Sequence, residues 1–161
     1  MKLQIGDKVP DFTTTAAFKG ADGRPQSTQW NLSAQVKKAP VLLVFYPGDN
    51  TPTCTKQLCD YRDNWESLSR FKVQIVGVST NDKESHEKFA AEKNFPFPLL
   101  EDSSKMICRQ LGMLMFGIGI AQRGFILVDS EMKVRYTFKE FLPMFRRTAA
   151  EVAEILKTHV N

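Results

Sequence analysis

The chain has 161 residues, of which 42% are hydrophobic and 25% charged, and its net charge is +4. This length suits one domain with its own core, and the composition excludes long disorder. No stretch approaches the roughly 20 apolar residues of a membrane-spanning helix, and residues 1–12 lack the apolar core of a secretory signal. We therefore expect a single domain over residues 1–161, located in the cytoplasm, without a membrane partner.

Charge and cysteine content narrow the function classes further. Lysines and arginines alternate with acidic residues along the chain, and no nucleic-acid-binding motif is present, so we expect no nucleic-acid partner. Three cysteines is an odd number, which argues against a secreted disulfide framework. Reactive or buried thiols in a reducing compartment are the better interpretation.

Hydrophobic periodicity in the first half predicts strands alternating with a helix. Residues 11–30 suggest a loose hairpin or two short extended segments, and 41-VLLVFY-46 is typical of a strand buried on both faces. From Pro52 to about Arg70, apolar residues at helical spacing predict one amphipathic helix. The run 73-VQIVGVS-79 predicts the next strand, so these segments should form a right-handed βαβ unit.

The second half continues this alternation. It contains a charged helix over residues 81–94, an extended stretch over 95–100 and a short helix stopped by glycine over 103–112. A hairpin of two strands over 124–138 and a last helix over 148–159 follow. Two prolines in the extended stretch leave a cis peptide bond open. The whole order predicts an α/β fold of three layers with a mixed central sheet.

The junction between the first buried strand and its helix reads 45-FYPGDNTPTCTKQLCDYRDNW-65. Thr51 is well placed as the helix N-cap, Pro52 suits the first helical position, and Cys54 falls in the first turn. Unpaired backbone N–H groups and the helix dipole at this end stabilise a thiolate, which is the nucleophilic form of cysteine. A lone cysteine here would be read as a small buried residue, but the nearby Cys59 argues against that reading.

The spacing of Cys54 and Cys59 limits how the two thiols can pair. In an intact α-helix, residues five apart have Cα atoms roughly 8 to 9 Å apart and side chains about 140° apart around the axis. A disulfide needs Cα atoms within about 7 Å, so pairing requires the first turns of the helix to unwind. That would suit a bond formed and broken in turnover, while core packing stays open as the alternative for Cys59. The spacing also differs from the C-x2-C of common redox and zinc motifs.

The motif P-x3-T-x2-C, formed by Pro47, Thr51 and Cys54, resembles that of the peroxiredoxins, specifically the bacterioferritin-comigratory or Q-type branch. The resemblance extends from the opening segment 5-IGDKVPDF-12 to Arg123, which stands six residues before Asp129. It implies a thioredoxin-like fold with an N-terminal β extension and a thiol peroxidase without metal or organic cofactor. It also implies a monomer, as is frequent in this branch.

Carried over to these positions, the resemblance gives each residue a role. Cys54 would be the peroxidatic cysteine, and Thr51 would direct its hydroxyl at the thiolate and the peroxide. Arg123 would hold the sulfur ionised, and Pro47 would wall the pocket. Cys59 would resolve the sulfenic acid as a disulfide, which a thioredoxin-type or glutaredoxin-type protein would reduce. The substrates would be hydrogen peroxide and alkyl hydroperoxides.

Other residues are expected to contribute less. We expect Cys108 to be a buried core thiol, with the role of resolving cysteine as a minor alternative, and we expect His86 and His159 to be solvated. The apolar segment 112-GMLMFGIGIAQ-122 should pack inward. It could instead form a subunit contact or an apolar rim of the active site, and such a rim would favour bulky organic hydroperoxides.

Two other functions remain open at this stage. A thiol-disulfide oxidoreductase without peroxidase activity would share the fold, although Thr51, Arg123 and the C-x4-C spacing argue against it. A non-catalytic redox sensor or metal-binding module, with His86 and the cysteines as ligands, belongs to a different class. Metal analysis and a peroxide-consumption assay would separate the three.

Overall fold

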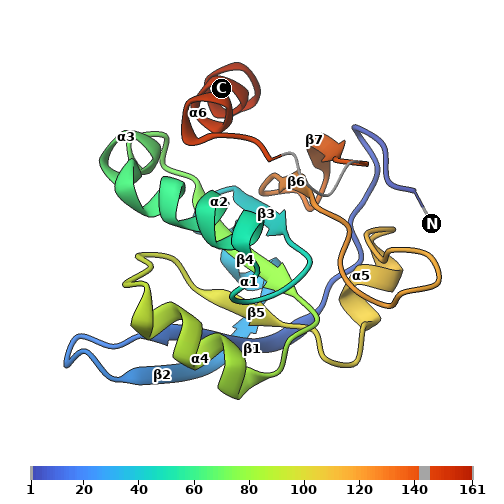
Figure 1. Ribbon diagram of the computed structural model, residues 1–161. Coiled ribbons are helices and arrows are strands. Elements are labelled where there is room, and N and C mark those ends of the chain that lie inside the picture. Colours follow the sequence, from blue (N-terminus) through green and yellow to red (C-terminus); the bar gives the residue numbers. More distant parts are fainter. Residues whose placement is uncertain (1, 142–145, 161) are drawn as a thin grey trace.

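The structure is a computed structural model, and it describes residues 2–141 and 146–160. Its strands form one seven-stranded sheet in the order β2-β1-β5-β4-β3-β6-β7 (Figure 1). The strands are β1 Thr13–Lys19, β2 Pro25–Asn31, β3 Val41–Phe45, β4 Gln74–Ser79, β5 Leu99–Glu101, β6 Gly124–Val128 and β7 Val134–Lys139. The helices are α1 Leu32–Val36, α2 Pro52–Asp63, α3 Trp65–Ser69, α4 Lys83–Glu92, α5 Met106–Gln110 and α6 Ala149–His159.

The sheet is mixed, as predicted. β3 and β4 are parallel and connected through α2 and α3, which confirms the βαβ unit. β5 continues the parallel part beside β4, whereas β6 pairs antiparallel with β3 and forms a hairpin with β7. At the other side, β1 and β2 form the expected N-terminal hairpin, and β1 pairs antiparallel with β5.

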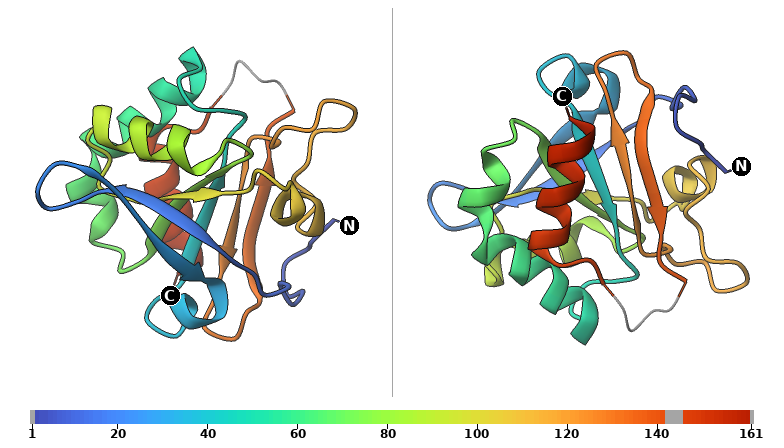
Figure 2. Two further views of the ribbon diagram at one scale, coloured as in Figure 1. Left: turned by 90° about the horizontal axis from the view of Figure 1, so that it is seen from below. Right: turned by 90° about the horizontal axis from the view of Figure 1, so that it is seen from above.

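Apolar side chains fill both faces of the sheet and define three layers. Every residue of β3 is buried, and its side chains alternate between two hydrophobic clusters. Leu43 belongs to the cluster that α1 and α5 cover, together with Phe12 and Trp30. Leu42 belongs to the cluster that α2, α3, α4 and α6 cover, and the view from above in Figure 2 has α2, α3 and α6 in front of the strands. A central strand with a continuous apolar sequence is the expected result of this arrangement.

Several local predictions need correction. The single helix expected over residues 52–70 is two helices, because the backbone leaves helical geometry at Asn64. The short helix α1, capped by the Asn31 side chain, has no counterpart in the sequence prediction. The prolines of residues 95–100 are all in trans, since no cis peptide bond occurs among the described residues. None of the described helices has the length and hydropathy needed to cross a membrane.

The segment 112–122 forms a small loop with both buried and exposed apolar residues. A single bridge pairs Leu114 with Ala121, and the tip turns through Gly117 and Gly119, both with positive φ. The expected inward packing holds for Met113, which is buried, but fails at the tip, where Phe116 is 100% exposed.

Candidate active site

Sheet register brings Cys54 and Arg123 together although they are 69 residues apart. β3 ends at Phe45, whose partner on β6 is Gly124, so Arg123 comes to lie beside the loop that connects β3 to α2. That loop leads into α2, where Pro52 is the first helical residue and Cys54 lies in the first turn, as predicted. The Cys54 side chain is fully buried.

Arg123 is the cation of this site. Its side chain is 4% exposed, its Nη2 donates a hydrogen bond to Cys54 Sγ at 3.2 Å, and its Nη1 donates to Gln57 Oε1. A guanidinium carries its charge at every relevant pH, and burial strengthens its attraction for negative charge on the sulfur. The next residue must be glycine, because a Cβ at Gly124 would stand 2.1 Å from the Phe138 carbonyl oxygen of β7.

Gln57 belongs to this site, although the sequence analysis did not single it out. It is buried on the same face of α2 as Cys54, three residues further along. Its Nε2 donates to the Tyr61 hydroxyl at 2.9 Å, which in turn donates to the Arg147 carbonyl at 2.8 Å. Burial raises the pKa of Tyr61 well above its ordinary value, so this hydroxyl stays protonated and can donate. A glutamine on the core face of an amphipathic helix was the signal that could have identified it.

Thr51 occupies the N-cap position but does not cap the helix with its side chain. Its backbone carbonyl accepts from Thr55 N at 2.8 Å, whereas its hydroxyl donates to the Gly48 carbonyl at 3.2 Å. The expected side-chain cap is therefore wrong, because the hydroxyl proton is used within the preceding loop. The oxygen lone pairs stay free to accept, so a role of Thr51 towards peroxide stays a prediction.

Pro47 and Cys59 lie on either side of this first turn. Pro47 is half-buried in the loop before α2, and Cys59 is half-buried on α2, packed against the cluster beneath that helix. Cys54 and Cys59 are both free thiols within one continuous helix. A bond between them would require the start of α2 to unwind, and the resolving role of Cys59 stays a prediction.

Comparisons with known proteins show which family the chain belongs to. Residues 5–137 match the model of the AhpC/TSA family. The chain belongs to this family, the peroxiredoxins. It is 35% identical over 115 residues to the putative peroxiredoxin bcp of Coxiella burnetii, covering 71% of this chain and 70% of that protein. It is 37% identical over 112 residues to the chloroplastic peroxiredoxin Q of Sedum lineare, covering 70% of this chain but 55% of that protein.

Solved structures show that the peroxiredoxin fold extends over nearly the whole chain. The peroxidoxin BcpB of Mycobacterium tuberculosis matches with a TM-score of 0.77 at 29% identity, over 97% of this chain and 96% of that one. AhpC of the same organism matches with a TM-score of 0.85 at 22% identity, covering 98% of each chain, which supports the fold alone.

His86 of this peroxiredoxin is not solvated, which corrects the sequence prediction. Its side chain is fully buried, with Nδ1 at 2.8 Å from Asp49 Oδ2 and Nε2 at 3.0 Å from the Leu100 carbonyl oxygen. The prediction failed because the helix α4 is strongly charged, and the sequence does not reveal which face it buries. With both nitrogens engaged, His86 is not placed to bind a metal ion together with the cysteines.

The third cysteine of the peroxiredoxin, Cys108, is a buried core thiol, as predicted. Burial, and then the Asp102 carboxylate, raise the pKa of this thiol well above its ordinary value. A thiol that stays protonated is a poor nucleophile, so Cys108 is unsuited to resolve a sulfenic acid in this conformation.

Proposed function

We propose that this peroxiredoxin reduces hydrogen peroxide and organic hydroperoxides through Cys54, in the manner of the bacterioferritin-comigratory and Q-type branch. The observation that carries the proposal is the 3.2 Å hydrogen bond from Arg123 Nη2 to Cys54 Sγ, formed between two buried side chains. A buried, permanent cation beside a helix-terminal thiol favours the thiolate that attacks peroxide.

The first step is attack of the Cys54 thiolate on one oxygen of the O–O bond. The sulfur is oxidised to a sulfenic acid, and the other oxygen leaves as hydroxide or alkoxide and takes up a proton to give water or an alcohol. Arg123 stabilises negative charge both on the sulfur and on the departing oxygen, and Gln57 fixes its orientation. Pro47 would shield the sulfur from water, and the Thr51 oxygen would accept a hydrogen bond from a peroxide O–H.

In the second step, the Cys59 thiolate attacks the sulfenic sulfur, so that a Cys54–Cys59 disulfide forms and hydroxide leaves and takes up a proton to give water. Both cysteines lie on α2, so its first turns must unwind before the two sulfurs can meet. Two thiol-disulfide exchanges with a thioredoxin-type or glutaredoxin-type protein would then restore both thiols. We place this cycle in the cytoplasm, where such reductants act, and expect a monomer, which light scattering would check.

Three cysteine variants test this proposal. Cys54→Ser should abolish peroxide removal, while Cys59→Ser should consume about one equivalent of peroxide and then stall as the sulfenic acid. Cys108→Ser is the matched control and should keep full turnover. Peptide mapping after a single oxidation should find Cys54 bonded to Cys59. Full turnover by Cys54→Ser would contradict the assignment, and a bond to Cys108 would overturn the resolving step.

A further inference from the structure

The loop between β3 and α2 holds a buried carboxylate that the proposed peroxide chemistry does not use. Asp49 stands between Pro47 and Thr51, and its side chain is 1% exposed. Burying a carboxylate is costly unless hydrogen bonds and an opposite charge compensate for the lost water. The groups around the Asp49 carboxylate therefore indicate why it is buried.

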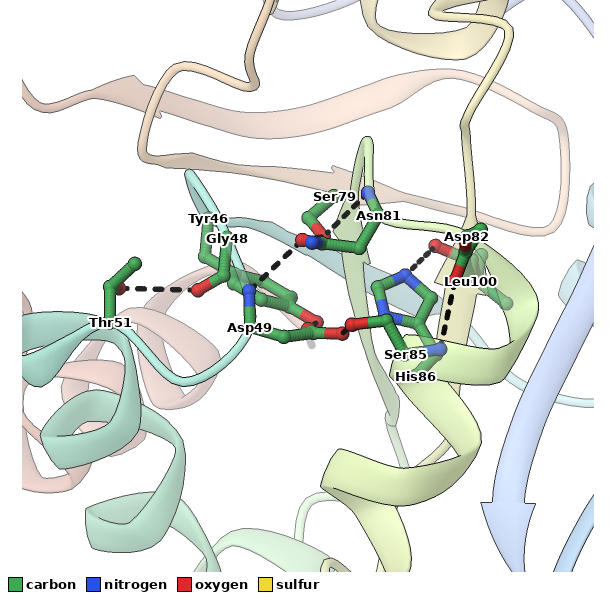
Figure 3. A network of polar contacts seen from close by, with 10 residues as sticks. All are labelled: Tyr46, Gly48, Asp49, Thr51, Ser79, Asn81, Asp82, Ser85, His86 and Leu100. Atoms are coloured by element: carbon green, nitrogen blue, oxygen red, sulfur yellow. Dashed lines mark hydrogen bonds and ion pairs between the residues drawn. The ribbon is translucent and has the colours of Figure 1, made fainter.

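Both oxygens of the Asp49 carboxylate receive hydrogen bonds (Figure 3). Oδ1 accepts from the Tyr46 hydroxyl at 2.7 Å, and Oδ2 accepts from the Ser85 hydroxyl at 2.6 Å and lies 2.8 Å from His86 Nδ1. Burial, and then the charge of Asp49, raise the pKa of Tyr46 well above its ordinary value, so its hydroxyl stays protonated. We refer to Asp49, Tyr46, Ser85 and His86 as the Asp49 clamp.

The geometry also shows how the histidine is held. His86 Nε2 lies 3.0 Å from the Leu100 carbonyl oxygen, which can only accept, and Nδ1 lies 2.8 Å from Asp49 Oδ2. Both ring nitrogens are thus engaged, and both side chains of the pair are buried. Loss of either partner would leave the other polar group buried without its contact, which is destabilising at this point of the structure.

The clamp joins the middle of the loop to elements that do not belong to α2. Its serine and histidine lie on α4, and the Leu100 carbonyl belongs to β5. In addition, Asp49 N donates to Asn81 Oδ1 at 2.9 Å, and the same oxygen accepts from Ser79 Oγ at the end of β4. The loop is thus held to the sheet and to α4 as far as Asp49.

The two residues that follow Asp49 are exposed, unlike the Asp49 side chain. Asn50 is exposed and adopts a left-handed conformation with φ of 62°, and Thr51 is exposed as well. A left-handed residue between a fixed point and a helix start is a natural hinge, because a small change in its dihedral angles redirects the following turn. The fixed part of the loop therefore ends at Asp49, directly before the part that must move.

We propose that Asp49 and His86 are positioning residues, which hold residues 46–49 of the loop so that Cys54 stays beside Arg123 until the start of α2 unwinds about Asn50. This inference rests on the proposed function, because it concerns the balance between the two fates of the Cys54 sulfenic acid. In the wound helix, a second peroxide oxidises it to a sulfinic acid and is itself reduced to water or an alcohol. In the unwound helix, Cys59 attacks it, and a disulfide and water are formed. A weaker clamp should slow the attack of Cys54 on peroxide, and it should favour the disulfide over the sulfinic acid as the product of the sulfenic acid.

Hydrogen exchange tests the clamp without any peroxide. His86→Gln keeps one donor but removes the ring that bridges Asp49 and the Leu100 carbonyl. His159→Gln is the matched control, because His159 lies on α6 against Tyr136 and outside the clamp. In the reduced full chain, amides of residues 50–59 should exchange about tenfold faster in His86→Gln than in the control. Equal exchange in this segment would overturn the inference even if the protein proved inactive with peroxide. The exchange result therefore distinguishes failure of this inference from failure of the proposed function.

Peroxide kinetics separate positioning from a general loss of stability. In His86→Gln, attack of Cys54 on hydrogen peroxide should slow by about tenfold, while the peroxide concentration that converts half of Cys54 to sulfinic acid should rise by at least about threefold. A general loss of folded protein would lower the amplitude and leave that concentration unchanged, and such a result would overturn the inference. If His86→Gln does not fold, Ser85→Ala removes one bond of the clamp and keeps the contact between Asp49 and His86. It should shift both quantities in the same directions by a smaller factor. If neither quantity shifted in Ser85→Ala, the inference would equally be overturned.

Discussion

Two helix starts in this peroxiredoxin carry a fully buried cysteine, and the charged group beside the thiol differs between them. Cys54 lies in the first turn of α2 and Cys108 in the first turn of α5. At α2, the sulfur receives a hydrogen bond from the Arg123 guanidinium. At α5, the Asp102 carboxylate accepts the backbone N–H groups of Ile107 and Cys108, at 2.9 and 2.8 Å.

The difference shows that burial and a helix terminus do not by themselves activate a thiol. A carboxylate at the start of α5 takes the backbone donors that would otherwise favour a thiolate, and its charge repels one. A guanidinium beside α2 has the opposite effect. The sign of the buried charge thus distinguishes the two thiols and favours Cys54 as the proposed nucleophile.

The largest expected effect comes from removing the cation. Arg123→Met keeps the length and apolar stem of the side chain but removes the charge, so the rate constant of Cys54 with hydrogen peroxide should fall by about 100- to 1000-fold. Stopped-flow fluorescence would measure it, and Arg109→Met, at an exposed arginine of α5, should leave it unchanged. A decrease of less than about threefold in Arg123→Met would show that the guanidinium is not what distinguishes the two helix starts.

The Asp102 carboxylate at the start of α5 should stabilise the folded protein. Asp102→Ala leaves the N–H groups of Ile107 and Cys108 buried without their acceptor, so the free energy of unfolding should decrease by about 2 kcal/mol. Urea denaturation would measure the change. Asp63→Ala is the control, since this carboxylate is 62% exposed in a surface ion pair and should change stability by less than about 0.5 kcal/mol. An effect of Asp102→Ala as small as that of the control would contradict a structural role of the carboxylate.

The smallest effect is a dependence of stability on pH. Because the pKa of Cys108 is raised in the folded state, the protonated thiol contributes stability that is fully present below the unfolded pKa of about 8.5. At higher pH the unfolded chain loses this proton first, so the folded state loses that advantage. Between about pH 8.5 and 9.5, the free energy of unfolding should fall by about 1 kcal/mol more in the wild type than in Cys108→Ala. Parallel curves for the two proteins under reducing conditions would contradict the raised pKa.

The elements and the position of Cys54 could be predicted because they depend on neighbours in the sequence. Burial of β3 on both faces followed from its continuous apolar run, and Pro52 marked the start of α2. Around the site, the errors arose where a remote partner decides the outcome. Gln57 was overlooked because its partner Arg123 lies 66 residues away, and His86 was taken as solvated because Asp49 lies 37 residues away.

The sequence by itself determined which residues could react: a thiol at a helix start, a second thiol five residues later, and the order of strands and helices around them. Only the tertiary structure decided which charge the Cys54 thiol meets, because antiparallel pairing of β3 with β6 brings Arg123 to it from 69 residues away, whereas Asp102 lies only six residues before Cys108. Local propensities act within a few residues, whereas the electrostatic environment of a buried atom is set by whatever segment the fold packs against it.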